Sequence, residues 1–457
     1  MYKRVQGEHR RQIHIVKPRT AAVLILNRLN NNLQNCDREI DRIARQENFF
    51  HSDRQLLHNI IKGVIQNLSY IDFLISLTYK KNIKKLERTV LNLMRVGIYQ
   101  AMLLKIPSYA AVFETVEAAK EICNLEVAKL INAVLRNLPD RTQIERELSR
   151  LPEIKRLSVE YSHPKWLTTK WIQQFGKEEA IELLRFNNSV YHPTFRHNPA
   201  VISWEKLKEM LLEQDLNIKE THLNGFHFFH TDNPARLLKS NIFKNRFCSV
   251  QDLSQALPVF LLNPAENETV LDCCAGPGGK TTLIAQLVRN IKVYANDISL
   301  RRLTLLKNEL KLLKLKNVEL LKLDAAKSRF PRIDKVLIDA PCTATGTIVK
   351  NVDIRWNRTP VDLKNLPELQ ISTLENMAQH IKNSGVIVYC TCSLEHEENW
   401  AVVDRFLQKH KEFKVEPAWN LIDKKYCDER GAISIIPHRH KMTGSFAVRL
   451  IKYNGQK

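Results

Sequence analysis

The sequence has no long hydrophobic run and no cysteine spacing of the kind that holds structural zinc. No apolar stretch in its 457 residues approaches the roughly 18 residues that a membrane-spanning helix needs. The nine cysteines are an odd number scattered over a long chain, which argues against a disulfide framework and for a reducing compartment. Paired C-x-x-C motifs at zinc-finger distance do not occur. We therefore expect a cytoplasmic protein with neither a membrane segment nor a bound metal.

The N-terminal segment has few apolar and few acidic side chains. MYKRVQGEHRRQIHIVKPRT contains no hydrophobic region such as a secretory signal requires, and Glu8 is its one acid. An organellar transit peptide fits this composition, but a basic arm that contacts RNA or a plain solvated tail fits it better. Residues 1–17 are accordingly expected to form a basic tail.

Acidic residues are in the minority along the whole chain. Asp and Glu number 49 against 70 Lys and Arg, so the formal charge is +21. The excess is +10 over residues 1–150, +3 over 151–250 and +8 over 251–457. Such an excess favours a polyanionic partner, nucleic acid before an anionic membrane surface, although a lysine-rich genome would also yield basic proteins. A hydrophobic fraction of 44% excludes disorder throughout.

The length and the changes of pattern predict three domains after the basic tail. At roughly 100–200 residues per domain, 457 residues are expected to hold two to four domains. Repeats and low-complexity tracts do not occur. We place the parts at residues 1–17 (tail), 18–142 (helical domain), 143–248 (connector domain) and 249–457 (C-terminal domain).

The first domain has the pattern of a bundle of short amphipathic helices. In residues 83–104 apolar side chains recur every three or four positions, which predicts a helix that ends before Pro107. Similar periods cover residues 112–122 and 126–138. In the connector, aromatic residues and prolines interrupt the periodicity, so a small mixed α/β domain is expected.

The C-terminal domain alternates short apolar runs with helical stretches, which predicts an α/β fold with a doubly wound parallel sheet. Strands are expected near 270–271, 293–295, 318–321, 336–338 and 386–389. Helices are expected near 279–289, 299–314, 365–382 and 397–409. Two late strands, 433–436 and 446–450, separated by a turn at Thr443-Gly444, should add an antiparallel edge.

A glycine-rich turn follows the first strand of this domain, in VLDCCAGPGGKTTLIAQL at residues 270–287. Ligands of doubly wound sheets lie beyond the carboxyl ends of the strands, where glycines let backbone N–H groups approach them and a helix begins. A tight turn without a ligand is the plainer alternative, and four small residues with a proline argue against it. The small residues and the proline are Ala275, Gly276, Pro277, Gly278 and Gly279.

A phosphate-binding P-loop is the nearer alternative for this turn. Gly279-Lys280-Thr281 resembles the end of such a loop. The glycine that a P-loop needs five residues earlier is Cys274, so the spacing argues against it.

Acidic residues follow three successive strands: Asp297, Asp324 and Asp339. One such residue would be a helix cap by default, but three on the ligand side exceed what capping requires. The acid after the second strand has the usual position for binding ribose hydroxyls. An adenosine-containing ligand with a positive centre fits all three, which favours S-adenosylmethionine over a dinucleotide.

Two cysteines follow the fourth and fifth strands: Cys342 in DAPCTATG and Cys392 in YCTCS. For either alone, a buried packing role would be favoured. Two at neighbouring strand ends beside a cofactor site are better explained by chemistry, because a thiolate is a strong nucleophile where its surroundings favour the charged form.

The helical domain resembles the NusB family of RNA-binding domains. The resemblance rests on LERTVLNLMRVGIYQAMLLKIPSYAAVFETVEAAKEI and on Asn132-Ala133-Val134-Leu135-Arg136, over roughly residues 18–140. It implies recognition of RNA or protein by this part of the chain.

The strand-end motifs resemble those of the RNA cytosine-C5 methyltransferases, and the whole of residues 18–450 resembles the RsmB (Sun/Fmu) subfamily, which methylates 16S ribosomal RNA. This implies a Rossmann-like, S-adenosylmethionine-dependent methyltransferase sheet. The loop Cys274, Ala275, Gly276, Pro277, Gly278, Gly279 and Lys280 would bind S-adenosylmethionine. Asp297, Asp324 and Asp339 match further cofactor and base contacts, Cys392 the nucleophile and Cys342 the residue that assists product release. Two more elements match the family: Gln251-Asp252 and Asp353-Ile354-Arg355-Trp356.

Two motifs depart from the family pattern. Thr343-Ala344 stand where Ser and then Gly or Ala are usual, and Thr443-Gly444-Ser445-Phe446 where Asp-Gly-Phe-Phe is usual. The first departure puts in doubt only a contact that would require a glycine without a side chain. The second puts in doubt a contact, near the end of the chain, to the substrate or to the core. Cys273 and Cys390 match no family role, and packing is expected for both.

The expected function is methyl transfer from S-adenosylmethionine to C5 of a cytosine in 16S ribosomal RNA, through a covalent bond between a cysteine and C6, by a monomer. A methyltransferase acting on nitrogen or protein needs no nucleophilic cysteine, so the cysteine pair argues against it. An RNA-binding scaffold with a degenerate enzyme domain would not need the loop, acids and cysteines together.

Overall fold

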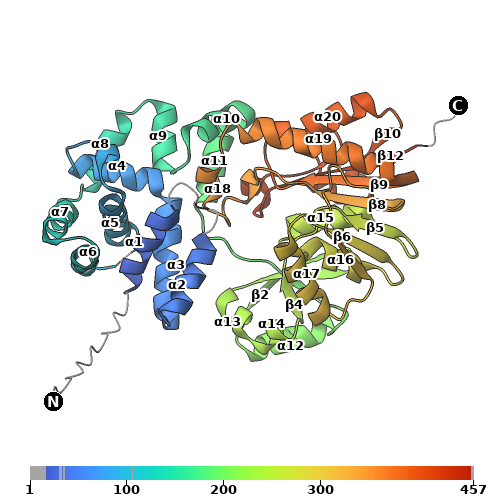
Figure 1. Ribbon diagram of the computed structural model, residues 1–457, viewed down its shortest axis with the longest axis horizontal. Coiled ribbons are helices and arrows are strands. Elements are labelled where there is room, and N and C mark those ends of the chain that lie inside the picture. The colour runs from blue at the N-terminus through green and yellow to red at the C-terminus, as the bar shows by residue number, and fades with distance from the viewer. Residues whose placement is uncertain (1–16, 30–32, 34–35, 105, 454–457) are drawn as a thin grey trace, which may run out of the picture. The chain divides into compact units, whose positions relative to one another are not determined.

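The computed structural model describes residues 17–29, 33, 36–104 and 106–453, so residues 1–16 of the predicted tail lie outside the described residues. The chain divides into two compact units. Unit 1 comprises residues 1–184 together with 355–357, and unit 2 comprises residues 185–354 and 358–457. Figure 1 shows helices in the first part of the chain and a twisted sheet between helices in the last.

Unit 1 is helical, as the sequence predicts for residues 18–142; residues 143–184, which the sequence analysis assigned to the mixed connector, are helical as well. Its elements are α1 (Pro18–Leu29), α2 (Cys36–Gln46), α3 (His51–Gln66), α4 (Leu68–Thr78), η2 (Ile83–Lys85), α5 (Arg88–Ile98), η3 (Tyr99–Leu103), α6 (Ser108–Ile122), α7 (Leu125–Arg136), α8 (Arg141–Ser149), α9 (Glu153–Glu160) and α10 (Lys165–Phe175). Helix α11 (Lys177–Asn187) runs across the division between the units. Helix α1 is the centre of the bundle, since it packs on α3, α5 and α6 and most of its residues are buried. Caps fix the helix starts: Asn124 accepts a hydrogen bond from the N–H of Val127, and Asp140 from that of Gln143.

The continuous helix predicted over residues 83–104 is wrong. The chain forms a 3-10 turn at η2, is extended at Leu86 and Glu87, and enters α5 at Arg88 before ending in a π-helical turn, η3. The Asn82 side chain accepts a hydrogen bond from the N–H of Lys84. Such side-chain bonds offer the backbone an alternative to the helix, which apolar spacing alone does not reveal.

Residues 355–357, from the family-like element Asp353-Ile354-Arg355-Trp356, group with unit 1. They belong to the short helix α18 (Ile354–Asn357). The buried Arg355 donates Nη1 hydrogen bonds of 3.1 Å to the carbonyls of Gln66 and Ser162, and Trp356 donates one of 2.7 Å to that of Ile65. Because Ile65 and Gln66 end α3, these donors satisfy carbonyls that the helix leaves unpaired.

Among the described residues, no single helix is long and apolar enough to cross a membrane. By length and composition alone, α3 and α4 pass together as a pair bent by 80°.

The first part of unit 2 contains a four-stranded antiparallel sheet, in the order β2-β3-β1-β4. Its elements are β1 (Phe195–His197), α12 (Trp204–Glu213), β2 (Ile218–Leu223), β3 (Phe226–Thr231), α13 (Pro234–Lys239), α14 (Asn241–Lys244) and β4 (Cys248–Val250). Asn224 and Gly225 both have positive φ, 48° and 79°, as the two-residue turn between β2 and β3 requires. The small α/β connector predicted from the sequence is thereby confirmed.

The second part of unit 2 is a mixed sheet of eight strands, seven of them in the order β10-β12-β9-β8-β5-β6-β7, with β11 paired to β12. The strands are β5 (Thr269–Asp272), β6 (Lys292–Asn296), β7 (Val318–Leu321), β8 (Ile333–Asp339), β9 (Ile381–Thr391), β10 (Phe413–Glu416), β11 (Ile433–Ile435) and β12 (Ser445–Lys452). The strands β5 to β9 are parallel, which confirms the predicted doubly wound sheet. The late strand β12 is not an edge, because it lies between β9 and the unpredicted β10.

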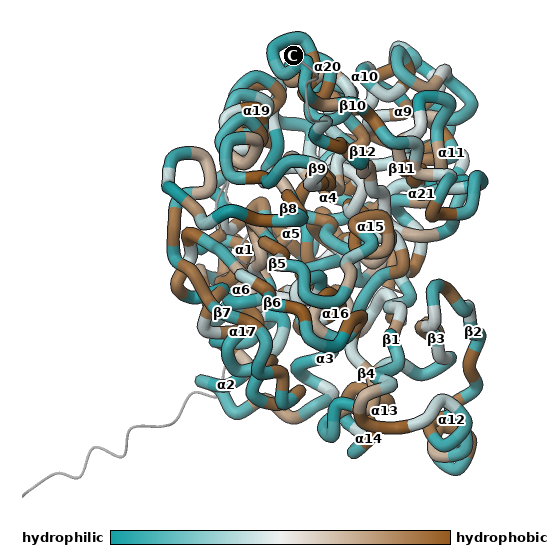
Figure 2. Tube along the Cα trace, turned by 90° about the vertical axis from the view of Figure 1, so that its right-hand side faces the viewer, coloured by the Kyte–Doolittle hydropathy of each residue, from teal (hydrophilic) through white to brown (hydrophobic). Residues whose placement is uncertain are grey.

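Helices cover both faces of this sheet around two large hydrophobic cores and a smaller one beneath α17. They are α15 (Leu253–Leu262), α16 (Gly279–Leu287), α17 (Leu300–Leu312), α19 (Asp362–His380), α20 (Trp400–Lys409) and α21 (Pro437–His440), with 3-10 turns η4 (Thr345–Thr347), η5 (His396–Glu398), η6 (Ala418–Asn420) and η7 (Lys424–Tyr426). One large core contains α15 and α16, and the other α19 and α20. Helix α15 is almost wholly buried, and Figure 2 shows it as mostly hydrophobic. Because helices cover both faces of the sheet, a ligand-binding site is expected at the carboxyl ends of the strands.

Candidate active site

Two adjoining cavities lie at the carboxyl ends of β5, β6, β8 and β9. The cysteine cavity, of about 300 Å³, is lined by Cys274, Gly276, Asp297, Asp324, Asp339, Cys342 and Cys392 among others. The lysine cavity, of about 250 Å³, shares Cys274, Gly276 and Asp339 with it and adds Ala275, Pro277, Gly278, Gly279, Lys280 and Lys350. Every site residue predicted from the sequence therefore lines one cavity or the other.

The glycines of the loop after β5 differ in whether the surrounding structure leaves room for a side chain. Gly278 has a φ of +117°, and a Cβ there would lie 2.4 Å from Leu306 Cδ1. A Cβ on Gly276 would lie 2.4 Å from Arg302 Cβ and 2.6 Å from Asp297 Oδ2. These two glycines are thus required by packing against α17 and the acid after β6. Gly279 differs, because the nearest atom to its Cβ position is 3.9 Å away.

Asp297 is 2% exposed and ties the loop to the end of β6. Its Oδ2 accepts a 3.0 Å hydrogen bond from the N–H of Gly276, and its Oδ1 accepts one of 2.8 Å from that of Ser299. Arg302 Nη2 lies 3.1 Å from Oδ1. Since each carboxylate oxygen has two lone pairs, the side chain that lines the cysteine cavity can still accept a further hydrogen bond through Oδ2. Asp324, on the same cavity, caps its own turn by accepting from the N–H of Ala326.

Lys280 and Asp339 form an ion pair that joins the loop to the end of β8. The Nζ of Lys280 lies 2.6 Å from Asp339 Oδ2 and donates a 2.9 Å hydrogen bond to Gln255. Burial alone would lower the pKa of Lys280, but attraction to Asp339 outweighs it and raises that pKa above its ordinary value. Lys280 therefore carries a fixed positive charge. The sequence identified both residues but not their pairing.

The thiols of Cys342 and Cys392 lie 3.4 Å apart, sulfur to sulfur. Strands β8 and β9 are parallel neighbours with Asp339 opposite Cys390, so the turns after them emerge side by side. The hydrogen bond with Cys392, burial and the charge of Glu398 all raise the pKa of Cys342 well above the ordinary thiol value. Cys342 is therefore a neutral thiol that can donate a proton to its neighbour.

Glu398 is a residue of this region that the sequence analysis missed. It is fully buried at the end of η5 and accepts a 2.8 Å hydrogen bond from the N–H of Thr343, another from the Thr343 hydroxyl, and one of 3.1 Å from Gln370 Nε2. The turn that carries Cys342 is thus anchored by a buried carboxylate. In the run His396-Glu397-Glu398-Asn399 the sequence does not distinguish this buried acid from Glu397, which is only partly buried.

Thr343, one of the departures from the family pattern, uses its hydroxyl in that anchor and also contacts Ser393 at 3.0 Å. At the other departure, Gly444 N donates a 2.7 Å hydrogen bond to Gly346 O, and Gly346 N donates one of 3.0 Å to Cys392 O. A Cβ on Gly444 would lie 2.7 Å from the Cα of Gly346. The glycine of this turn is therefore required, whereas its neighbour Ser445 is a buried residue of β12.

The two cysteines expected to pack are both buried in the core, but both also reach the site: Cys273 lines the cysteine cavity, and Cys390 contacts Asp339. The Sγ of Cys390 donates to Asp339 Oδ1 at 3.7 Å. Asp272, at the end of β5, is likewise buried beneath the loop, where Thr281 donates a 2.7 Å hydrogen bond to its Oδ2. Within the described residues, no group of three or more His, Cys, Asp or Glu is placed to hold a metal ion.

Three family models match the chain. The model "16S rRNA methyltransferase RsmB/F" covers residues 259–451, the NusB family model 16–140, and a ferredoxin-like domain of RsmF/B-like methyltransferases 163–225.

Individual relatives match over most of their length. The probable ribosomal RNA small subunit methyltransferase B of Bacillus subtilis is 30% identical, over 90% of this chain and 93% of the relative. The ribosomal RNA small subunit methyltransferase B of Escherichia coli O6:K15:H31 is 31% identical, over 89% of this chain and 92% of the relative. The crystal structure of PH0851 matches with a TM-score of 0.79 and 25% identity, over 96% of this chain and 99% of the other.

Proposed function

We propose that this chain, which belongs to the ribosomal RNA small subunit methyltransferase B family, methylates C5 of a cytosine in 16S ribosomal RNA through a covalent cysteine adduct. Members of this family are methyltransferases that use S-adenosylmethionine. The observation that carries the proposal is the pair of thiols, 3.4 Å apart, on the cavity that also holds the glycine-rich loop and Asp297. A methyltransferase acting on a nitrogen atom would have no use for that pair.

The residues of the cysteine cavity fit S-adenosylmethionine. Asp297 supplies a buried carboxylate whose Oδ2 has an unused lone pair, which suits a ribose hydroxyl. Asp324 adds negative charge on the same cavity, which suits the positive sulfonium centre, and Asp339 presents a carboxylate whose charge Lys280 balances. When bound, S-adenosylmethionine supplies an electrophilic methyl group.

Cys392 is the proposed nucleophile. Cytosine C5 is too weak a nucleophile to accept a methyl group unaided, but addition of a thiolate to C6 turns the ring into an enamine whose C5 is reactive. Cys392 lines the cysteine cavity, and its sulfur lies 3.4 Å from the sulfur of Cys342. Asp339, which lines both cavities, is positioned to accept a hydrogen bond from N3 of the base when N3 is protonated, the form to which a thiolate adds more readily.

Cys342 is proposed to act in product release. After methyl transfer the C5 proton leaves, its electron pair restores the C5–C6 double bond, and the bond between C6 and the Cys392 sulfur breaks. The neutral Cys342 thiol can donate its proton to the departing sulfur 3.4 Å away, and the resulting Cys342 thiolate can accept the C5 proton. The target base must be unstacked to reach the cavity.

Nucleoside analysis tests the chemistry of the product. The protein is incubated with methyl-labelled S-adenosylmethionine and unmodified 16S ribosomal RNA, which is then digested to nucleosides. We expect the label in 5-methylcytidine. Label on a purine, or on uridine alone, would contradict the proposal. Cys123→Ala, at a partly exposed cysteine of unit 1, controls for the loss of a thiol and should retain activity.

A further inference from the structure

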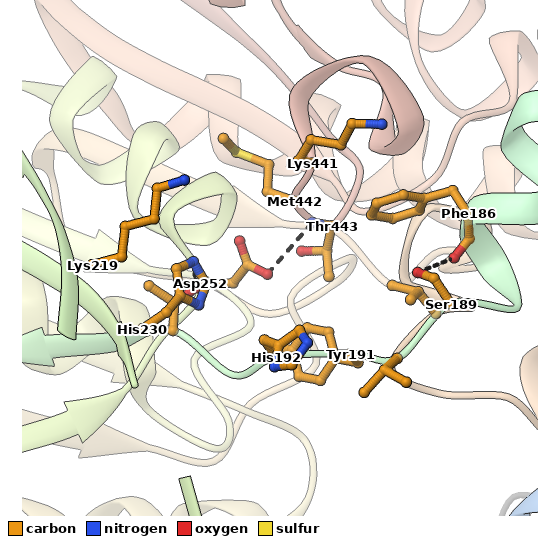
Figure 3. Close-up of a pocket in the computed structure, with 13 residues that line it drawn as sticks. Phe186, Ser189, Tyr191, His192, Lys219, His230, Asp252, Lys441, Met442 and Thr443 are labelled. Carbon is orange, nitrogen blue, oxygen red and sulfur yellow. Dashed lines mark hydrogen bonds between the residues drawn. The ribbon is translucent and has the colours of Figure 1, made fainter. Parts of the chain in front are cut away.

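A third cavity, of about 340 Å³, lies beside the lysine cavity within unit 2. We call it the tyrosine cavity, after Tyr191 (Figure 3). It is lined by the end of α11 and the segment after it, by strands β2 and β3 of the connector, and by the turn between α21 and β12. Asp252 and Thr443 line both the tyrosine and the lysine cavities, so the two adjoin. The mechanism proposed above does not use the tyrosine cavity.

Aromatic rings form much of its wall and carry nearby cations. The Nζ of Lys350 lies 5.8 Å from the ring centroid of Tyr191, and that of Lys441 lies 5.9 Å from the centroid of Phe186. The hydroxyl of Tyr191 is buried and has no hydrogen-bond partner among the described residues. Burial and the charge of Asp252 raise the pKa of Tyr191, which keeps this hydroxyl a neutral donor. The wall thus offers a flat ring, with a buried, unpaired hydroxyl at its edge.

Asp252 gives the cavity a hydrogen-bond acceptor. It is 5% exposed, and its Oδ1 accepts from both the N–H and the hydroxyl of Ser254. Among the residues that the structure describes, its Oδ2 accepts only a long 3.4 Å bond from the N–H of Thr443, which Figure 3 shows as a dashed line. Oδ2 can therefore accept from an N–H group of a ligand.

The rim of the cavity is basic. Lys219, on β2, and Lys441, after α21, are both exposed and line the cavity. Neither forms an ion pair within the described part of the chain. Unpaired lysines around an aromatic pocket with a buried acceptor suit a nucleotide. Its phosphate would contact the lysines, its base would stack on the aromatic ring, and an N–H of the base would donate to the carboxylate.

We propose that the tyrosine cavity binds a nucleotide of the RNA substrate that neighbours the target cytosine. Its base would stack on Tyr191 and donate an N–H hydrogen bond to Asp252, and its phosphates would contact Lys219 and Lys441. A volume of about 340 Å³ lies at the small end of the roughly 300–1,000 Å³ of ligand pockets, which suits one nucleotide. This inference rests on the proposed function, since it takes the substrate to be an RNA whose target base reaches Cys392 in the cysteine cavity.

Photocrosslinking locates the RNA without requiring methylation. The full-length protein is irradiated with unmodified 16S ribosomal RNA, and crosslinked peptides are identified by mass spectrometry. A crosslink within residues 186–194 supports the inference. Crosslinks confined to other parts of the chain would overturn it. Because this readout does not depend on the atom that is methylated, a crosslink at residues 186–194 combined with label on a purine would refute the cytosine-C5 proposal and leave the subsite standing.

Two matched pairs of variants measure the contribution of the subsite. Tyr191→Ala should raise the KM for RNA by about tenfold or more, because it removes a stacking ring, while kcat at saturating RNA stays near that of the unsubstituted protein. Tyr191→Phe keeps the ring and should retain most of the affinity. Lys219→Ala should weaken RNA binding and reduce its salt dependence, whereas Lys244→Ala, at an exposed lysine of α14, should do neither. Equal KM values for both tyrosine variants and the unsubstituted protein would overturn the proposal.

Discussion

At the scale of single residues, Asp272 links the stability of unit 2 to pH. Burial, opposed by the hydrogen bond from Thr281, raises its pKa from 3.8 to about 7. Between these values the folded protein holds a proton that the unfolded chain has lost, so the contribution of Asp272 to stability is full below about pH 4 and disappears as the pH rises through 7.

Asp272→Asn should therefore gain stability over the unsubstituted protein as the pH rises. Asparagine keeps an acceptor for Thr281 but carries no charge to bury. The difference in the free energy of unfolding, variant minus unsubstituted protein, should increase by roughly 2–3 kcal/mol between about pH 5 and pH 8. Denaturant unfolding at both pH values measures it. A difference that does not change with pH would contradict this account of Asp272.

Asp297 should matter to the cofactor more than to the fold. In Asp297→Asn one oxygen can still accept from the N–H of Gly276, but the charge is lost. Hydrogen bonds to a charged group contribute about 1.5–3 kcal/mol each, so binding of S-adenosylmethionine should weaken about tenfold or more. Calorimetry on the full chain measures it, with Glu319→Gln on the exposed face of β7 as a control that should bind normally. Unchanged affinity in a folded Asp297→Asn would place the cofactor elsewhere.

The sequence predicted the position of each acid and cysteine but not their mutual contacts. Asp297, Asp339, Cys342 and Cys392 could be placed because residues that follow parallel strands meet at one edge of the sheet. The Lys280–Asp339 pair could not, because it depends on side-chain conformations across two elements. Burial of Glu398 depends on how η5 packs, which no local pattern expresses.

At the scale of elements, the turn after β8 is held by the turn after β9 through Glu398. Glu398→Gln removes the negative charge that receives the N–H and hydroxyl of Thr343, which should lower the free energy of unfolding by about 2–3 kcal/mol. A misplaced Cys342 should also slow release of the methylated RNA, so the covalent adduct should accumulate above its level in the unsubstituted protein. The adduct distinguishes positioning from mere loss of stability.

Glu368→Gln is the matched control for that change. Glu368 pairs with Arg405 on the surface and its side chain is 63% exposed, so the variant should change stability by no more than about 0.5 kcal/mol and leave the adduct level unaltered. If both glutamate variants show the same adduct level as the unsubstituted protein, Glu398 has no positioning role.

Regular elements followed from the sequence where hydrophobic periodicity was long or strands were fully buried. The strands β5 to β9 and their helices were predicted for this reason. The break at Leu86 and Glu87 was missed because apolar spacing continues across it, and β10 because four residues, Phe413–Glu416, are too short a pattern. Strand β12 was taken for an edge because pairing partners are not encoded locally.

At the scale of the whole molecule, the excess of positive charge predicts salt-dependent RNA binding by the first 250 residues. Residues 1–250 carry +13 of the net +21. Around η2, Lys80, Lys81, Lys84 and Lys85 are all exposed, and none forms an ion pair within the described residues. Four lysines so placed form a cationic patch that suits an RNA backbone.

Replacing these four lysines by glutamine should weaken binding of 16S ribosomal RNA and flatten its dependence on salt. If all four contact phosphates, the slope of log affinity against log salt should fall in magnitude by up to about 3. Filter binding at several salt concentrations measures the slope. As a control, glutamine at the ion-paired Lys206, Lys292, Lys409 and Lys425 removes the same charge from other surfaces. An equal loss in both variants would mean that net charge, and not this patch, binds RNA.

The division of the chain was only partly accessible from its sequence. The two compact units separate at residue 184, inside the stretch assigned to the connector, and unit 1 also takes up residues 355–357. This distant segment joins unit 1 through buried contacts such as those of Arg355. No change in the composition of the sequence predicts these contacts. The division into domains at residues 142 and 248 stays a prediction, as does the monomeric state.

The most direct test of the central claim compares Cys392→Ala with Cys342→Ala. Each full-length variant is incubated with 16S ribosomal RNA, with and without S-adenosylmethionine, and protein–RNA complexes that survive denaturation are measured by gel electrophoresis. Cys392→Ala should abolish methyl transfer and form no adduct, because no bond to C6 can form. Cys342→Ala should accumulate a denaturant-resistant complex that depends on added S-adenosylmethionine, because methylation proceeds but release fails. An adduct trapped by the Cys392 change would reverse the assigned roles, and methyl transfer by Cys392→Ala at the unsubstituted rate would refute covalent catalysis by this pair.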